Sequence, residues 1–261
     1  MNNFENVDLG WQPEPLWDEW PKGRDTEFIM WRMEQAFVDI AKLGGTGRML
    51  DAACGQARHV PELHRAGWQV FGLEPSPEMI VRARHETDVA GVPLELYRGI
   101  GEVLPFKDAS FDRVVCMSSL DHYADPAKGM REMARVLKPD GRVIIAVVNY
   151  HGLSCRASRL VYKLQRRFKV VPAGKRLLWD DPTMGEHTFE GSVPAMRTHA
   201  GSALALESTY GVSMLWALPG WSTVIGVFPG RIASTIIRGI DALARKLPGA
   251  SDFIVTTWRR S

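Results

Sequence analysis

The stretch that decides the fold is MLDAACGQARHV, residues 49–60. An apolar pair leads into Asp51, and a turn with a single glycine, Gly55, leads into a segment that continues as a helix. A strand, a tight turn and a helix in this order form the ligand-binding unit of doubly wound α/β proteins. The stretch therefore predicts a ligand site at the carboxyl end of a first strand.

Strands and helices alternate from this stretch as far as residue 150. Further strands are predicted over 68–75, 93–99, 111–119 and 142–150, and helices over 59–67, 76–91 and 125–141. Ser76 and Pro77 are typical of a helix start, and the third helix is predicted to end at Pro139 and Gly141. This alternation indicates an α/β fold, with a doubly wound, mostly parallel sheet and helices on both faces.

The segments on either side of this core are less regular. Residues 1–24, which include Trp11, Trp17 and Trp20, predict an irregular arm that could form a lid, and residues 25–43 predict a helix. Beyond the core, helices are predicted over 152–170, 193–207 and 231–247, and strands over 211–221 and 252–260. The first of these helices is amphipathic and rich in Lys and Arg.

Composition narrows the function classes. The formal net charge is +2 over 261 residues, and the basic cluster at 152–170 is one helix rather than a broad patch, so nucleic acid is not an expected partner. Three scattered cysteines without a C-x-x-C pair argue against a disulfide framework and a structural zinc site. We therefore expect no metal site. We also expect a cytoplasmic location, because the first residues do not form a secretory signal.

The turn after the first strand limits the kind of ligand. A dinucleotide site needs the glycines of G-x-G-x-x-G so that the backbone can approach a pyrophosphate, and here Gly55 is the only glycine between Asp51 and Val60. The G-K-[ST] of a phosphate-binding loop is also absent. The remaining candidate is a nucleoside ligand without phosphate, S-adenosylmethionine.

Three longer stretches carry a resemblance to a known family. They are LDAACGQARHVPELHRAGWQVFGLEPSPEMIVRAR (50–84), GIGEVLPFKDASFDRVVCMSSLDHYADP (99–126) and EMARVLKPDGRVII (132–145). In order and spacing they resemble the class I S-adenosylmethionine-dependent methyltransferases, in particular the small-molecule group known as type 11. The resemblance implies a Rossmann-like, seven-stranded sheet with helical cap insertions.

The resemblance also implies a division of the chain. Residues 1–44 would be an N-terminal arm and helix that act as a lid or cap, and residues 45–150 the cofactor-binding core. Residues 151–207 would be a basic cap insertion, and residues 208–261 would complete the sheet with strands and an amphipathic helix.

The family's cofactor contacts can be carried over position by position. Asp51 would engage the methionyl end of S-adenosylmethionine, Gly55 would let the backbone pass close to it, and Glu74 would accept hydrogen bonds from both ribose hydroxyls. The other positions that the resemblance assigns to the cofactor are Ala53, Cys54, Pro75, Met79, Ile100, Gly101, Glu102, Met117 and Ser118.

Four positions depart from the family pattern. Ala53 and Ala57 stand where the family has glycine, and Ile100 stands where an acidic residue usually contacts the adenine. Glu74 replaces the usual aspartate and is one methylene longer, which leaves its acceptor chemistry unchanged. An alanine forced to positive φ would cost about 1 kcal/mol or more. We expect these departures to weaken cofactor binding rather than abolish it.

Methyl transfer needs a base only when the acceptor must lose a proton. His122, just beyond the fourth strand, is the first candidate base, although a loop histidine can equally serve to hydrogen-bond the backbone. Asp121 could orient it. His187 is a second candidate that could instead shape the pocket.

The acceptor is less constrained by the sequence. The basic segment 152–170 and the uncharged segment 208–230 permit a small-molecule or lipid-linked acceptor and peripheral membrane contact through 152–170. A homodimer is also expected, on weaker grounds. The alternatives to a methyltransferase are a non-catalytic or atypical cofactor-binding protein on the same scaffold, and a different reaction such as a cyclisation.

Overall fold

The computed structural model describes residues 23–168 and 187–261. The predicted lid with Trp11, Trp17 and Trp20 lies outside the described residues, as does the end of the basic segment 152–170. The predictions for the remaining segments can be compared with the structure directly.

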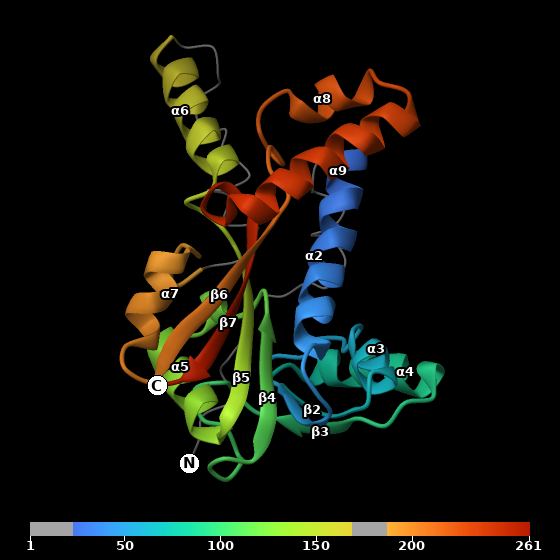
Figure 1. Cartoon of the computed structure of the whole chain (residues 1–261), viewed down its shortest axis with the longest axis vertical. Coiled ribbons are helices and arrows are strands. Elements are labelled where there is room, and N and C mark those ends of the chain that lie inside the picture. Colours follow the sequence, from blue (N-terminus) through green and yellow to red (C-terminus); the bar gives the residue numbers. More distant parts are fainter. Residues whose placement is uncertain (1–22, 169–186) are drawn as a thin grey trace.

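A seven-stranded sheet forms the centre of the molecule, in the order β3-β2-β1-β4-β5-β7-β6 (Figure 1). All neighbouring strands pair in parallel except β7, which runs antiparallel to β5 and to β6. The strands are β1 (Gly47–Asp51), β2 (Trp68–Glu74), β3 (Glu95–Arg98), β4 (Phe111–Met117), β5 (Leu137–Val148), β6 (Leu204–Val212) and β7 (Phe253–Arg260). The predicted fold class is confirmed.

Helices cover both faces of this sheet (Figure 1). One layer contains α2 (Arg24–Lys42), α3 (Val60–Arg65) and α4 (Pro77–Ala90), and the other contains α5 (Pro126–Val136) and α7 (Val193–Ala200). The remaining helices are α6 (Leu153–Arg167), α8 (Trp221–Gly226), α9 (Gly230–Lys246) and the short 3₁₀ turns η2 (Leu120–His122) and η5 (Pro248–Ala250).

The central strands are buried on both faces, which explains their almost continuous apolar sequence. In β1, Met49 packs into the cluster under α2 and α3, while Leu50 packs into the cluster under α5. Ser76 caps α4 by accepting a hydrogen bond from the Met79 amide, as the sequence predicts. The turns between strands and helices are therefore fixed by local capping as well as by packing.

The helix predicted over 125–141 is too long. It ends at Val136, and residues 137–141 begin β5, where Leu137 pairs with Phe111 before a register shift. Pro139 explains the difference, because a residue before proline is pushed out of the α region and proline cannot donate a helical hydrogen bond.

The predictions over 193–221 are also wrong in part. The helix ends at Ala200, where Gly201 takes positive φ, and residues 204–212 form strand β6. The strand predicted over 211–221 therefore covers only the last two residues of β6, and residues 213–220 form a loop. The amides of Ser213 and Trp216 in this loop donate to the carboxylates of Asp241 and Asp252, which hold it in an irregular path.

The amphipathic helices do not bury the faces that their apolar residues suggest. In α6 the buried side chains are Ser154, Cys155 and Ser158, while an apolar stripe stays exposed that includes Leu160, Leu164 and Phe168. In α9 the exposed apolar residues are Ile232, Leu243 and Leu247. Within residues 23–168 and 187–261, no helix is long and apolar enough to cross a membrane.

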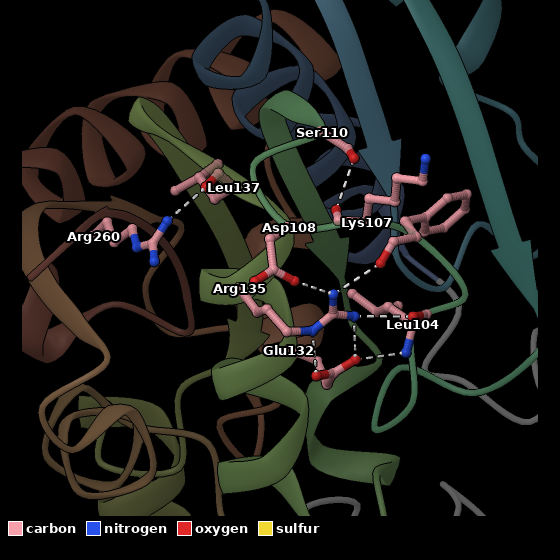
Figure 2. A network of polar contacts seen from close by, with 9 residues as sticks. Leu104, Lys107, Asp108, Ser110, Glu132, Arg135, Leu137 and Arg260 are labelled. Atoms are coloured by element: carbon pink, nitrogen blue, oxygen red, sulfur yellow. Dashed lines mark hydrogen bonds and ion pairs between the residues drawn. The ribbon is translucent and has the colours of Figure 1, made fainter.

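A polar clasp fixes the loop between β3 and β4 (Figure 2). The Arg135 guanidinium on α5 donates to the carbonyls of Leu104 and Phe106 at 3.0 and 2.8 Å and pairs with the carboxylates of Asp108 and Glu132. These carboxylates raise the pKa of Arg135, and the Arg135 contact lowers the pKa of Glu132. The clasp holds the loop that carries residues 100–102.

Replacing Arg135 with alanine is expected to lower the free energy of unfolding by about 2–4 kcal/mol, because several charge-assisted hydrogen bonds lose their donor together. Urea unfolding measures the effect. Arg131→Ala is the matched control on the same helix, since Arg131 is exposed and lies 3.9 Å from Asp125; it should change stability by less than about 0.5 kcal/mol. Equal effects for the two variants would contradict the clasp.

Candidate functional site

The predicted site residues come from the carboxyl ends of neighbouring parallel strands. Asp51 ends β1, Glu74 ends β2 and Met117 ends β4. Because β1 pairs in parallel with both β2 and β4, these three ends lie at one edge of the sheet. The structure thus brings the acidic and sulfonium-facing positions of the prediction together.

Asp51 is fully buried, and only one of its two carboxylate oxygens has a hydrogen-bond partner among the described residues. Its Oδ2 lies 2.6 Å from Nε2 of His59, while its Oδ1 has no hydrogen-bond partner among the described residues. Burial alone would lower the pKa of His59, but the charge of Asp51 and the hydrogen bond to it outweigh burial and raise that pKa. The unpartnered Oδ1 leaves a buried acceptor for a ligand's amino group.

His59 was not recognised in the sequence as a site residue. It is the N-cap residue of α3, and its ring packs edge-on against Phe37 of α2 at 5.4 Å between centroids. The sequence did contain a signal for this pair. His59 lies eight positions after Asp51, in a segment that must fold back over β1.

Glu74 links the turn after β1 to the turn after β2. Its Oε2 accepts from the Gly55 amide at 3.0 Å, and its Oε1 accepts from the Ser76 amide at 2.9 Å. Burial raises the pKa of Glu74, although both amide hydrogen bonds act in the opposite direction. A carboxylate has about four acceptor positions, so Glu74 can still accept hydrogen bonds from two ligand hydroxyls.

The turn after β1 leaves open space in front of its glycine. Gly55 has φ 52°, and a Cβ added there would meet nothing within 4 Å. Of the two alanines that replace family glycines, Ala57 takes φ 57° and Ala53 does not take positive φ. Ala57 therefore carries a backbone cost of about 1 kcal/mol, partly offset by burial of its methyl group.

The other predicted residues of these turns have mainly structural contacts. Cys54 is buried against Gly72, and burial raises the pKa of its thiol well above the usual range, so it is not a nucleophile. The carbonyl of Pro75 accepts from Arg98 at 3.2 Å. Met79 is buried at the start of α4.

The loop after β3 packs against Tyr123. A Cβ on Gly101 would come within 2.1 Å of the Tyr123 hydroxyl, which donates to the Ala52 carbonyl at 2.9 Å. Glu102 is buried and accepts from the Ala124 amide at 2.8 Å. Ile100 is partly exposed at the start of this turn. Contact of these residues with an adenine remains a prediction.

Ser118 follows Met117 at the end of β4 in an unusual conformation. It has φ 50°, its amide donates to the Ala146 carbonyl at 2.8 Å, and its buried Oγ lacks a partner in the described part of the chain. A serine held in the left-handed region costs of order 1–3 kcal/mol, and such residues concentrate at functional sites.

Beyond Ser118, η2 brings Asp121 and His122 beside His187. The rings of His122 and His187 are 4.7 Å apart between centroids, and His187 Nε2 lies 3.6 Å from Asp121 Oδ2. The amide of Thr188 donates to the Asp121 carbonyl at 2.7 Å and ties the two segments together. Burial and the neighbouring His122 lower the pKa of His187, against the opposing charge of Asp121.

The Asp51–His59 pair predicts a pH dependence. A histidine whose folded-state pKa is raised adds stability below its unfolded pKa of about 6.5, and this contribution is lost as the pH rises through the folded pKa. The free energy of unfolding should therefore fall more steeply between pH 6 and 9 in the wild type than in His59→Gln. Urea unfolding across this range measures both slopes, and equal slopes would argue against the pair.

Parts of the chain are similar in sequence to known proteins. Residues 50–145 match the family model described as a methyltransferase domain. The chain is 35% identical over 104 residues to a ubiquinone biosynthesis O-methyltransferase of Xylella fastidiosa strain 9a5c, covering 39% of this chain and 42% of that protein. It is 30% identical over 138 residues to the uncharacterized methyltransferase YcgJ of Bacillus subtilis strain 168, covering 49% and 54%. The chain spans about half the length of these curated relatives.

Solved structures share the fold over most of the chain. The PH0226 protein of Pyrococcus horikoshii OT3 gives a TM-score of 0.57 at 18% identity, covering 92% of this chain and 93% of that chain. The [4+2]-cyclase SpnF gives 0.58 at 18%, covering 87% and 80%. Geranyl diphosphate methyltransferase in complex with SAM gives 0.55 at 16%, covering 87% and 84%. The matched domain, the curated relatives and this topology support a class I S-adenosylmethionine-dependent methyltransferase.

Proposed function

We propose that this protein transfers the methyl group of S-adenosylmethionine to a small-molecule acceptor. The observation that carries the proposal is the pair of buried carboxylates at neighbouring strand ends, Asp51 with an unpartnered oxygen and Glu74 with spare acceptor positions. A Cβ added at Gly55 would meet nothing within 4 Å, so the turn beside these carboxylates leaves room for a ligand. These residues fit a ligand that has an amino group and a ribose.

The roles of the residues follow from their chemistry. The cofactor supplies an electrophilic methyl group, and the protein supplies alignment and exclusion of water. Asp51 Oδ1 would accept from the ammonium group of the methionyl end, and Glu74 would accept from the ribose hydroxyls. Met117 and Ser118 at the end of β4 would lie near the sulfonium.

Calorimetric titration with S-adenosylhomocysteine tests the site. Glu74→Gln is expected to weaken binding about tenfold or more, because hydrogen bonds to a charged group contribute about 1.5–3 kcal/mol. Glu95→Gln is the matched control, since Glu95 is an exposed carboxylate on the adjacent strand β3. Thermal unfolding of each variant separates a lost contact from a lost fold.

Two results would count against the proposal. Wild-type protein that binds neither S-adenosylmethionine nor S-adenosylhomocysteine would favour a non-catalytic protein on this scaffold, in which the strained Ala57 closes the cofactor path. Binding without methyl transfer would favour an atypical reaction, since the fold is shared with a protein named as a [4+2]-cyclase.

His122 is the proposed proton acceptor when the acceptor is a hydroxyl. In the in-line step, the acceptor oxygen bonds to the methyl carbon, the carbon–sulfur bond breaks, and the hydroxyl proton moves to the imidazole. The position of His122 on η2, directly after the end of β4, supports this role.

The acceptor is proposed to be lipid-linked and reached at a membrane surface. Leu160, Leu164 and Phe168 of α6 are exposed by 59%, 49% and 72% and share one helix face. Exposed basic side chains flank this face, namely Arg156, Lys163, Arg166 and Arg167. Such a helix is complementary to anionic lipid. The name of the Xylella relative, a ubiquinone biosynthesis enzyme, is consistent with an acceptor of this class.

Co-sedimentation with phosphatidylglycerol vesicles tests this part of the proposal. The double variant Leu160→Asp, Phe168→Asp should weaken binding at least tenfold, since each buried apolar side chain contributes on the order of 2 kcal/mol. Val89→Asp, an exposed position on α4, serves as the control. Binding that is equal for the double variant, or absent in the wild type, would exclude the membrane surface.

A further inference from the structure

The cluster beside His122 contains a buried carboxylate that is short of positive partners. Asp121 is 3% exposed, and its Oδ1 has no hydrogen-bond partner among the described residues. Burying a carboxylate oxygen without a hydrogen bond costs free energy. Such an oxygen is therefore found where a neighbouring group or a bound species offsets its charge. Two imidazoles, those of His122 and His187, are the neighbouring groups.

The two nitrogens of His187 both face polar partners. Nδ1 lies 3.1 Å from the Tyr150 hydroxyl, and Nε2 lies 3.6 Å from Asp121 Oδ2. Burial raises the pKa of Tyr150, so its hydroxyl keeps its proton and can donate to Nδ1. A neutral ring then carries its proton on Nε2, where the N–H dipole points at the carboxylate. The opposite tautomer would point a lone pair at a negative charge.

His122 differs from His187 in its contacts. Its ring lies against that of His187, and no hydrogen bond to the His122 side chain is formed within the described residues. The charged and titratable groups that face this pair are Asp121 on η2 and Tyr150 after β5, with Arg159 and Glu190 beyond Tyr150. His122 is thus the ring with a nitrogen available to a ligand.

We propose that Asp121 and Tyr150 are positioning residues that hold His187 as its neutral Nε2–H tautomer, which leaves His122 to take the proton of the acceptor. The proposal rests on the proposed function, because it assumes an acceptor that loses a proton. Before transfer the cluster carries the Asp121 charge alone; after transfer the imidazolium of His122 compensates that charge. The proton leaves to water when the product leaves.

A divalent cation is the competing explanation for the unpartnered carboxylate. One ligand atom from each of Asp121, His122 and His187 lies within 4.8 Å of the others. A cation, however, needs the Nε2 lone pair of His187 directed toward it and therefore the Nδ1–H tautomer. The tautomer of His187 separates the two explanations without any knowledge of the acceptor.

The test is long-range ¹H–¹⁵N NMR of histidine-labelled full-length protein, assigned with His122→Gln and His187→Gln. At pH 7.5 we expect His187 to be protonated on Nε2, and Tyr150→Phe to convert it to a mixture of tautomers. In Asp121→Asn, the pKa of His187 should fall, because the negative charge that raises this pKa is removed. Asp125→Asn, which changes an exposed carboxylate four residues away, is the control and should leave the pKa of His187 unchanged.

Three results would overturn the proposal. The first is an Nδ1–H tautomer of His187 in the wild type. The second is a pKa of His187 that is unchanged in Asp121→Asn, together with a single tautomer in Tyr150→Phe. The third is stoichiometric Zn²⁺ binding that Asp121→Asn abolishes. The last result would assign a metal site. Since the spectra need neither cofactor nor acceptor, failure of S-adenosylhomocysteine to bind would refute the proposed function and leave the tautomer measurement intact.

Discussion

Parallel pairing of β1 with both β2 and β4 is the constraint on which the site depends. It places the ends of three strands at one edge of the sheet, so that Asp51, Glu74 and Met117 meet although they are far apart in the sequence. The register is maintained by apolar side chains on both faces of each strand, with Met49 and Leu50 packing into opposite clusters. The hydrophobic core thus determines where the polar residues lie.

The buried carboxylates of Asp51, Glu74 and Asp121 at this edge are compensated in different ways. Asp51 pairs with His59, Glu74 accepts two backbone amides, and Asp121 lies beside two imidazoles with one oxygen unpartnered. Each arrangement leaves acceptor capacity that the protein itself does not use. Because buried polar groups are normally satisfied, this unused capacity is the physical basis of the proposed ligand site at this edge.

Much of the core could be predicted from the sequence, because its signals are local. The strand-ending Asp51, the capping Ser76 and the apolar runs of β4 and β5 each indicate one structure independently of distant contacts. The end of α5 was misplaced because the effect of Pro139 extends to the residues before it. The strand β6 was misplaced because its nine residues show no regular alternation of buried and exposed side chains. Gly201 is the main local signal that separates this strand from α7.

Other features could not be predicted because they depend on contacts between distant segments. His59 becomes a partner of Asp51 only when the turn folds back over β1, and Tyr150 meets His187 only when the chain returns after α6. The apolar residues of α6 and α9 predicted amphipathic helices, but periodicity does not show whether an apolar face packs on the sheet. In the structure a large part of each face is exposed.

A crystal structure of the protein with S-adenosylhomocysteine would test the central claim most directly. The account predicts both ribose hydroxyls within hydrogen-bond distance of the Glu74 carboxylate and the ligand's amino group at Asp51 Oδ1, with the Asp51–His59 contact intact. A ligand bound away from the ends of β1 and β2, or one whose ribose and amino group make neither contact, would contradict it.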